Sequence, residues 1–361
     1  MTQDGFKFNR ISYESYYVAL TIFLLAVFVT AAASGAVHLS VGQIWGFILH
    51  KLGMTDSRGI NPVQEGVFFQ IRLPRVLMCV VAGAGLSVSG ALMQALFRNP
   101  IVEPGLIGTS SGAAFGAAFI FVVGKDIGFL SDTPLGGFVL PITAFACGFA
   151  STTLVYRVST VQGKATVATM LLAGIAVNAI AAGGTGFMSY IARDPQARSI
   201  TFWNLGTFSG ADWRSFWIAA PVTVLTIVLT LRSSKGLNAL LLGEEEAGYL
   251  GVRTETLKRR IIFLNCLVVG VVTSIVGVIV FVGLVVPHIL RMLRGSDNRF
   301  LIIGSSLLGP IVMLLADMFA RLVIAPAEMP IGIVTAFVGA PVFLYILLRK
   351  EKPGRSGGFY A

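Results

Sequence analysis

Two short motifs in the sequence could support chemistry. Gly108-Thr-Ser-Ser-Gly112 matches the pattern G-x-S-x-G, in which Ser110 would be a nucleophile, and His288 in a later apolar segment could be its base. An intramembrane serine protease is therefore the enzymatic alternative. No strand is expected before the motif, and glycine and serine at a helix start are typical of closely packed membrane helices, so the packing interpretation is favoured.

A second motif would concern nucleotide binding. Gly163-Lys164 is like the end of a phosphate-binding loop, but that loop needs Gly five positions before this Gly and Ser or Thr after the Lys. Those positions hold Val158 and Ala165. The chain is therefore not expected to bind ATP or to be an enzyme, and any ATP hydrolysis belongs to a separate subunit.

Residues that could bind a metal are too scattered to form a site. The three cysteines and three histidines show no metal-ligand spacing: Cys79, Cys147, Cys266, His38, His50 and His288. Ionisable residues within the apolar runs are nearly absent, so the chain lacks the usual coupling groups of an ion-driven carrier. We expect no metal and no cofactor bound by this chain.

The elements that must position any site are long apolar runs. The chain has 361 residues, of which 55% are apolar and 12% charged, with a mean hydropathy of +0.82. About 20 helical residues cross a hydrocarbon core, and continuously apolar runs favour helices over a membrane β-barrel. Nine such runs lie at residues 16–37, 76–97, 104–124, 133–156, 165–192, 215–231, 261–290, 300–316 and 329–348. The sequence predicts an all-α, multi-pass membrane bundle that forms one transmembrane domain, 1–361.

The number of crossings depends on the run 261–290. As one straight helix it would be about 45 Å long, too long for a core of about 30 Å. Gly283 and Pro287 offer break points, so we expect a broken, doubled-back segment, about ten crossings and two cytoplasmic termini.

The formal charge of +10 is explained by this topology. Basic residues then concentrate on the cytoplasmic side, which is the positive-inside pattern and does not indicate nucleic-acid binding. They are Arg232, Lys235, Arg253, Lys258, Arg259, Arg260, Arg291, Arg294, Arg299, Arg349, Lys350, Lys352 and Arg355.

Polar segments at each side of the membrane could contact partners. The cytoplasmic loop at approximately 233–259 contains a short amphipathic pattern followed by Glu244, Glu245 and Glu246. A cytoplasmic helix with an apolar side needs a partner surface. On the outer side, Arg72 and Arg75 either snorkel at a helix end or, with Arg321, form a docking patch for an acidic protein.

Ordered segments along nearly the whole chain resemble the FecCD-type permeases of ABC importers for ferric siderophores, haem and cobalamin. The segments are Arg72-Leu-Pro-Arg-Val, residues 89–113, Met170-Leu-Leu-Ala-Gly174, Leu241-Leu-Gly-Glu244, residues 281–291, and residues 315–321 with 328–332.

The resemblance implies an assembly in the bacterial cytoplasmic (inner) membrane. It consists of a homodimer of ten-helix protomers surrounded by membrane lipid, two cytoplasmic ATP-binding cassette subunits that hold ATP and Mg, and a periplasmic or lipoprotein substrate-binding protein. Haem or siderophore members are the better match, through residues 98–100, 104–112 and 198–203, and a cobalamin permease is the alternative.

The resemblance also implies roles for particular residues. Docking of the binding protein is expected at Arg72, Arg75 and Arg321. Coupling to the ATPase is expected at Leu242, Gly243, Glu244, Leu250 and Gly251, although three acids stand at 244–246 where one is expected. A cytoplasmic gate is expected at Asn99, Ile101, Thr166 and Val167.

Overall fold

The computed structural model describes residues 13–35, 37–54, 60–124 and 136–349. In this part the chain is helical apart from one antiparallel hairpin of two short strands, β1 (Thr160–Val161) and β2 (Lys164–Ala165). The helices are α1 (Tyr13–Ala33), α2 (Val41–Lys51), α3 (Pro62–Val67), η1 (Phe68–Arg72), α4 (Leu73–Leu96), η2 (Pro104–Ile107), α5 (Thr109–Val123), α7 (Gly136–Val158), α8 (Val167–Ile191), α9 (Gln196–Asn204), α10 (Trp213–Leu231), α11 (Ser234–Leu242), α12 (Glu244–Tyr249), α13 (Thr254–Val276), α14 (Val282–Arg294), α15 (Asn298–Leu322) and α16 (Ile331–Arg349).

The predicted apolar runs are occupied by helices, which confirms the predicted helical membrane bundle. Within the described residues, seven helices are long and apolar enough to cross a membrane. The helices α5 and α14 are shorter, at 15 and 13 residues. At about 1.5 Å per residue α14 is roughly 20 Å long, less than the hydrocarbon core. Irregular backbone precedes both short helices, which is tolerated at membrane depth where protein surrounds it.

The run 261–290 is broken, as predicted, but at a different place. Helix α13 ends at Val276, and Gly277 and Phe281 adopt positive φ angles of 77° and 69° before α14 begins. The predicted break points Gly283 and Pro287 are wrong, because both lie within α14. Gly283 instead allows close packing: a Cβ atom on it would lie 2.8 Å from the Leu86 carbonyl oxygen of α4, and one on Gly90 of α4 would overlap the Gly283 carbonyl.

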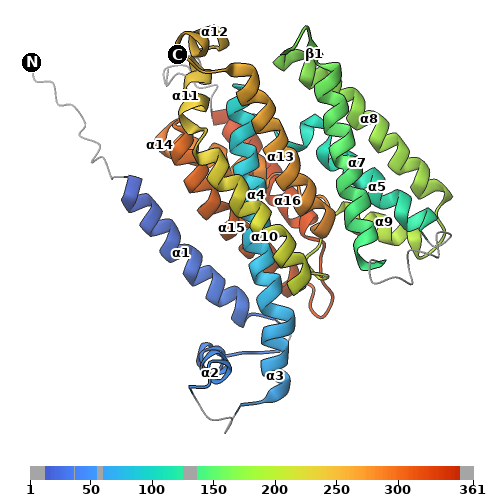
Figure 1. Ribbon diagram of the computed structural model, residues 1–361. Helices are drawn as coiled ribbons and strands as arrows, with labels where there is room; N and C mark the ends of the chain where they lie inside the picture. Colours follow the sequence, from blue (N-terminus) through green and yellow to red (C-terminus); the bar gives the residue numbers. More distant parts are fainter. Residues whose placement is uncertain (1–12, 36, 55–59, 125–135, 350–361) are drawn as a thin grey trace, which may run out of the picture.

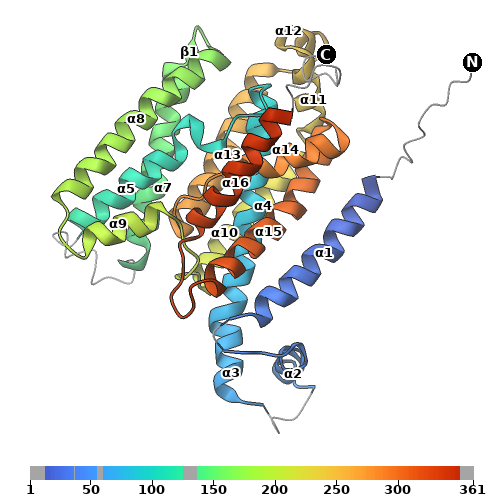
Figure 2. The ribbon, with the colours of Figure 1, turned by 180° about the vertical axis from the view of Figure 1, so that it is seen from behind.

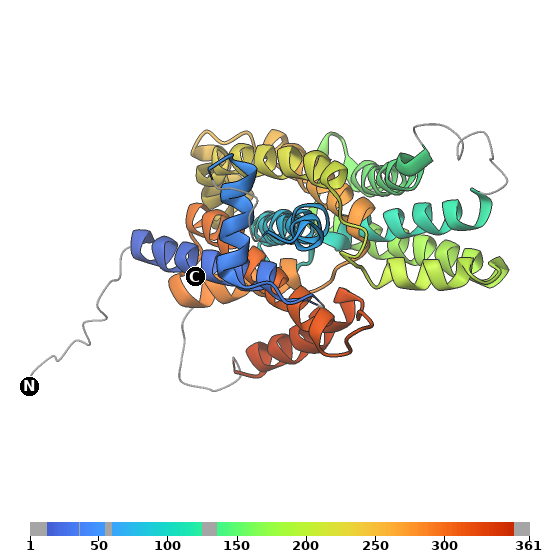
Figure 3. The ribbon, with the colours of Figure 1, turned by 90° about the horizontal axis from the view of Figure 1, so that it is seen from below.

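Helix α4 is the centre of the bundle. It packs against α10, α13, α14 and α15, which surround it in the view along its axis (Figure 3). A Cβ atom on Gly83 would lie only 2.6 Å from the Gly309 carbonyl oxygen of α15, and Ser87 Oγ donates a 2.7 Å hydrogen bond to the Ser305 carbonyl. Small side chains therefore bring these backbones into direct contact, the usual means of helix association in lipid.

A second group of helices lies beside this bundle. Helices α5, α7 and α8 pack against one another, with α9 against α5 and α8, and Figures 1 and 2 show them together on one side. Helix α13 contacts both α4 and α7. It therefore joins the two groups, as does η2, which contacts α4 and α8.

The two ends of the molecule differ. Helices α11 and α12 and the β1–β2 hairpin lie at one end, and α2 and α3 lie at the other (Figure 1). We refer to these as the cytoplasmic and outer ends, following the predicted topology. The prediction that both termini are cytoplasmic concerns residues 1–12 and 350–361, which lie outside the described residues, as do Lys350, Lys352 and Arg355.

Candidate coupling and gating site

The cytoplasmic loop between α10 and α13 folds into the two short helices α11 and α12. Leu240 and Ala247 are buried, whereas Leu242, Tyr249 and Leu250 are 67%, 89% and 65% exposed. One side of this loop therefore packs onto the bundle, and the other presents large apolar side chains at the cytoplasmic end. A cluster of exposed apolar side chains of this kind is typical of a surface that binds another protein.

Two glycines set the shape of this loop. Gly243 has φ +142° and ψ 159° and separates α11 from α12, and Gly251 has φ +82° after the end of α12. Residues with side chains rarely adopt such angles. A Cβ atom on Gly243 would also overlap the Glu246 carboxylate. Both predicted coupling glycines thus have a conformational reason to be glycine.

Polar side chains fix α11 to the start of α15. Asn238 Nδ2 donates a 3.0 Å hydrogen bond to Asp297 Oδ2, and Asn238 Oδ1 accepts one of 2.8 Å from the Asn298 backbone N–H. Asp297 Oδ1 in turn accepts from the Phe300 N–H at 2.8 Å and so caps α15. Sequence reasoning missed these residues, although an Asp before an apolar helix is a recognisable N-cap signal.

Of the three acids at 244–246, Glu244 is directed inward. Its Oε2 lies 2.5 Å from Nζ of Lys258, whose side chain is only 2% exposed. Glu245 and Glu246 are exposed. The three acids therefore have different surroundings, which their adjacent positions in the sequence do not indicate.

The predicted gate residues lie in two turns at the cytoplasmic end. Asn99 Oδ1 accepts a 3.0 Å hydrogen bond from the Ile101 N–H, which holds the turn after α4, and Ile101 is 45% exposed. Thr166 directly precedes α8, its N–H donates to the Ser159 carbonyl at 3.3 Å, and Val167 begins the helix.

One hydrophobic cluster connects the turns at residues 99–101 and 166–167, the gate turns, with the α11–α12 loop, the coupling loop. Val102, Ala165, Leu240 and Ile261 belong to it, and Val167 packs against it. These residues come from the turn after α4, from β2, from α11 and from α13. A movement of any one of these segments must therefore repack the others, since close-packed interiors transmit displacement.

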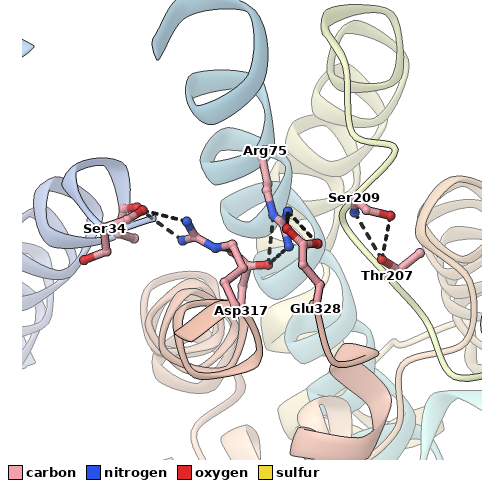
Figure 4. A network of polar contacts seen from close by, with 8 residues as sticks. Ser34, Arg75, Thr207, Ser209, Asp317 and Glu328 are labelled. Atoms are coloured by element: carbon pink, nitrogen blue, oxygen red, sulfur yellow. Dashed lines mark hydrogen bonds and ion pairs between the residues drawn. The ribbon is translucent and has the colours of Figure 1, made fainter. Parts of the chain in front are cut away.

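At the outer end, Arg75 and Arg321 share one buried carboxylate (Figure 4). Asp317, 1% exposed, accepts from Arg75 Nη2 and from Arg321 Nε, both at 2.9 Å. Arg75 also binds Glu328 at 2.8 Å, and the Glu328 side chain is 40% exposed. The side chains of Arg75 and Arg321 are themselves only 11% and 8% exposed.

Arg72 has a different environment. It is 6% exposed and lies in the π-helical turn η1. Its Nη1 donates to the carbonyls of Ala32 and Ala33 at 3.1 and 2.7 Å, and its Nη2 donates to that of Val37. A cation here satisfies the free carbonyls at the end of α1. The three predicted docking arginines are thus engaged within the protomer, and docking stays a prediction.

The serine-protease alternative does not bring its residues together. Ser110 lies in the first turn of α5, which packs against α7 and α8, whereas His288 lies in α14, which packs against α4 and α15. A Cβ atom on Gly112 would lie 2.7 Å from the Cys147 carbonyl oxygen. Gly112 therefore serves the contact between α5 and α7, and Gly108 has a positive φ of 90° directly before α5. Among the described residues, no three His, Cys, Asp or Glu side chains are grouped so that they could hold a metal ion.

Comparison with known proteins identifies the chain. The model of the FecCD transport family matches residues 22–349. The chain belongs to the FecCD transport family. As a member, it is a permease subunit of an ABC importer and is not itself an ATPase, in agreement with the sequence prediction.

Individual relatives cover most of the FecCD-family chain. The hemin transport system permease protein HmuU of Yersinia pestis is 38% identical over 338 residues, 94% of this chain and 96% of its own. The vitamin B12 import system permease protein BtuC of Salmonella paratyphi A is 38% identical over 284 residues, 79% of this chain and 84% of its own. A solved ABC transporter assigned to the metal-chelate type, in an inward-facing conformation, has a TM-score of 0.80 at 32% identity and covers 93% of this chain and 99% of its own.

Proposed function

We propose that this permease moves a ferric chelate, either haem or a siderophore complex, inward across the bacterial cytoplasmic membrane. The observation that carries the proposal is the extent of the match to the hemin permease, which spans 94% of this chain against 79% for the vitamin B12 permease at equal identity. A cobalamin importer is the alternative. The relevant assembly is a homodimer with two ATPase subunits and a binding protein.

The structure supports a route from ATP hydrolysis to the gate. The ATPase subunit binds the exposed apolar side of the coupling loop, centred on Leu242, Tyr249 and Leu250. Its closure displaces α12, and the shared hydrophobic cluster carries the displacement to the turns at Asn99–Ile101 and Thr166–Val167. Cargo then passes along the dimer axis without chemical change, because the free energy of ATP hydrolysis is used to shift a two-state gate.

Charge at the outer end supports docking of an acidic protein. The ion-pair cluster of Arg75, Arg321, Asp317 and Glu328 has a formal charge of zero, and Arg72, which binds backbone carbonyls instead, adds +1. Glu328 is the exposed member. A carboxylate of the binding protein can exchange with Glu328 on Arg75 while Asp317 continues to hold both arginines in place.

The cargo is tested by uptake of labelled haem, a labelled ferric siderophore and labelled cobalamin into cells deleted for this subunit and then complemented. We expect complementation to restore uptake of haem or the siderophore. Selective restoration of cobalamin would establish the alternative, and no change for any of the three would refute importer function for this class of cargo.

The coupling surface is tested with a matched pair of variants. Leu250→Ser should reduce retention of the ATPase subunits during purification by about tenfold, because a central apolar contact is lost. Leu52→Ser is the control, since Leu52 is equally exposed, at 67%, but follows α2 at the outer end. Equal ATPase retention by the two variants would contradict the assignment.

A further inference from the structure

Lys258 is a buried cation in the second turn of α13 with three partners. Its Nζ donates to Glu244 Oε2 at 2.5 Å, to Glu255 Oε1 at 2.9 Å and to the Ala165 carbonyl at 2.9 Å. A lysine ammonium has three N–H donors, so these contacts use all of them. A charge with 2% of its side chain exposed is retained in a protein only when it is paired in this way.

The same turn of α13 also holds the other backbone group of Ala165. Glu255 Oε2 accepts a 3.0 Å hydrogen bond from the Ala165 N–H. Both the N–H and the carbonyl of this one residue of β2 are therefore bound by side chains that lie three residues apart on α13. Ala165 is followed directly by Thr166 and Val167 of the proposed gate.

The third partner of Lys258 belongs to the proposed ATPase contact. Glu244 is the first residue of α12, the helix that ends with the exposed Tyr249. Lys258 thus joins three segments that are separate in the chain: α12, the first turns of α13, and the β1–β2 hairpin that precedes Thr166 and Val167, which we call the gate hairpin. The contacts of Nζ with Glu244 and Ala165 span 14 and 93 residues of sequence.

We propose that Lys258 is a positioning residue that transmits displacement of α12 to the gate hairpin within the same protomer. The inference rests on the proposed function and names the polar link in its coupling path. Displacing α12 alone would remove one of the two carboxylates that bind a buried ammonium and leave one of its N–H donors without an acceptor, which is unfavourable, so Lys258 and Ala165 move with Glu244. Apolar contacts in the hydrophobic cluster have no preferred direction, whereas charge-assisted hydrogen bonds fix the direction of the movement.

The proposal is tested on the assembled transporter, with its ATPase and binding protein, reconstituted in liposomes. The readouts are the ATP hydrolysis rate and the amount of cargo transported for each ATP hydrolysed. We expect Lys258→Met, which keeps the apolar stem, to lower transport per ATP by about fivefold or more while ATP hydrolysis continues. Lys258→Arg keeps the charge and should restore part of the transport, a rescue that a loss of folding would not show.

A matched pair of variants on α12 tests the same link without changing the buried Lys258 itself. Glu244→Gln removes the carboxylate that binds Lys258, and Glu245→Gln makes the same change at an exposed neighbour. We expect the loss of transport per ATP only for Glu244→Gln. If Lys258→Met fails to assemble, this pair decides the question.

The results separate the two proposals. If the unaltered assembly transports cargo and both Glu244→Gln and Lys258→Met keep its transport per ATP, the link through Lys258 is refuted and the importer proposal stands. An equal defect in Glu244→Gln and Glu245→Gln would also refute the link, because surface charge would then be the cause. If the unaltered assembly transports none of the cargoes, the proposed function itself fails.

Discussion

Asp317 neutralises two buried arginines, so its removal should destabilise the outer end of the bundle. Its two oxygens accept hydrogen bonds from Arg75 and Arg321 at 2.9 Å, and its side chain is 1% exposed. Removing one partner of a buried ion pair costs about 3–5 kcal/mol. Because Arg75 keeps Glu328 in the variant Asp317→Ala, we take the lower limit of about 3 kcal/mol, which for a chain of 361 residues corresponds to a decrease in unfolding temperature of about 4 °C.

The assay is thermal unfolding of the purified permease in nanodiscs, followed by intrinsic fluorescence. Glu328→Gln is the matched control: it removes another carboxylate from Arg75, but one that is 40% exposed. An exposed ion pair contributes about 0–1 kcal/mol, so the expected decrease is less than about 2 °C. Equal unfolding temperatures for Asp317→Ala and the unaltered protein would refute the electrostatic reasoning.

Two further predictions concern other parts of the fold. Gly90→Ala should lower the unfolding temperature, because its Cβ atom would overlap the Gly283 carbonyl and overpacking costs about 1–3 kcal/mol. The control is Gly183→Ala in α8, where an added Cβ atom would meet nothing within 4 Å, so the unfolding temperature should be unchanged or higher. The opposite order of the two unfolding temperatures would contradict the packing argument. At Asp212, burial alone would raise the pKa, but hydrogen bonds from Ser215 and the charge of Arg214 outweigh it and lower the pKa below the ordinary value of 3.8. The stability that this N-cap contributes is therefore present above pH 3.8 and is lost as the pH falls through the lowered pKa. The stability difference between the unaltered protein and Asp212→Asn, measured by unfolding at pH 3–7, should therefore shrink only at the acidic end, and a difference that is constant down to pH 3 would contradict this.

The apolar runs were predictable because lipid imposes a simple rule on sequence: a crossing helix must be apolar along its length. Length also revealed the break in the run 261–290. Its position at Gly277 could not be assigned, because glycine serves both for reversal and for close packing, and Gly283 serves for packing. The structure, not the residue type, separates these two uses.

The polar contacts at the site were largely unpredictable for a physical reason. The sequence predicts only a topology-setting charge at Lys258. Its contact with Ala165 leaves no pattern, because Ala165 is 93 residues away and contributes a backbone carbonyl, which every residue has. The three carbonyls bound by Arg72 are 35, 39 and 40 residues away and equally leave no sequence pattern. By contrast, the capping box of α2, formed by Ser40 and Gln43, follows a local rule and was detectable.

The position of α1 has a consequence for biogenesis. This helix is synthesised long before α15, yet it packs on α15, and Arg321 reaches the carbonyl of Ala31 across 290 residues of sequence. Until α15 is inserted, α1 must persist in lipid with its partner surface unfilled, which is feasible because a helix satisfies its own backbone hydrogen bonds there. A helix that is synthesised early thus reaches its final neighbours late, and we expect chains stalled before α15 to expose α1 to membrane quality control.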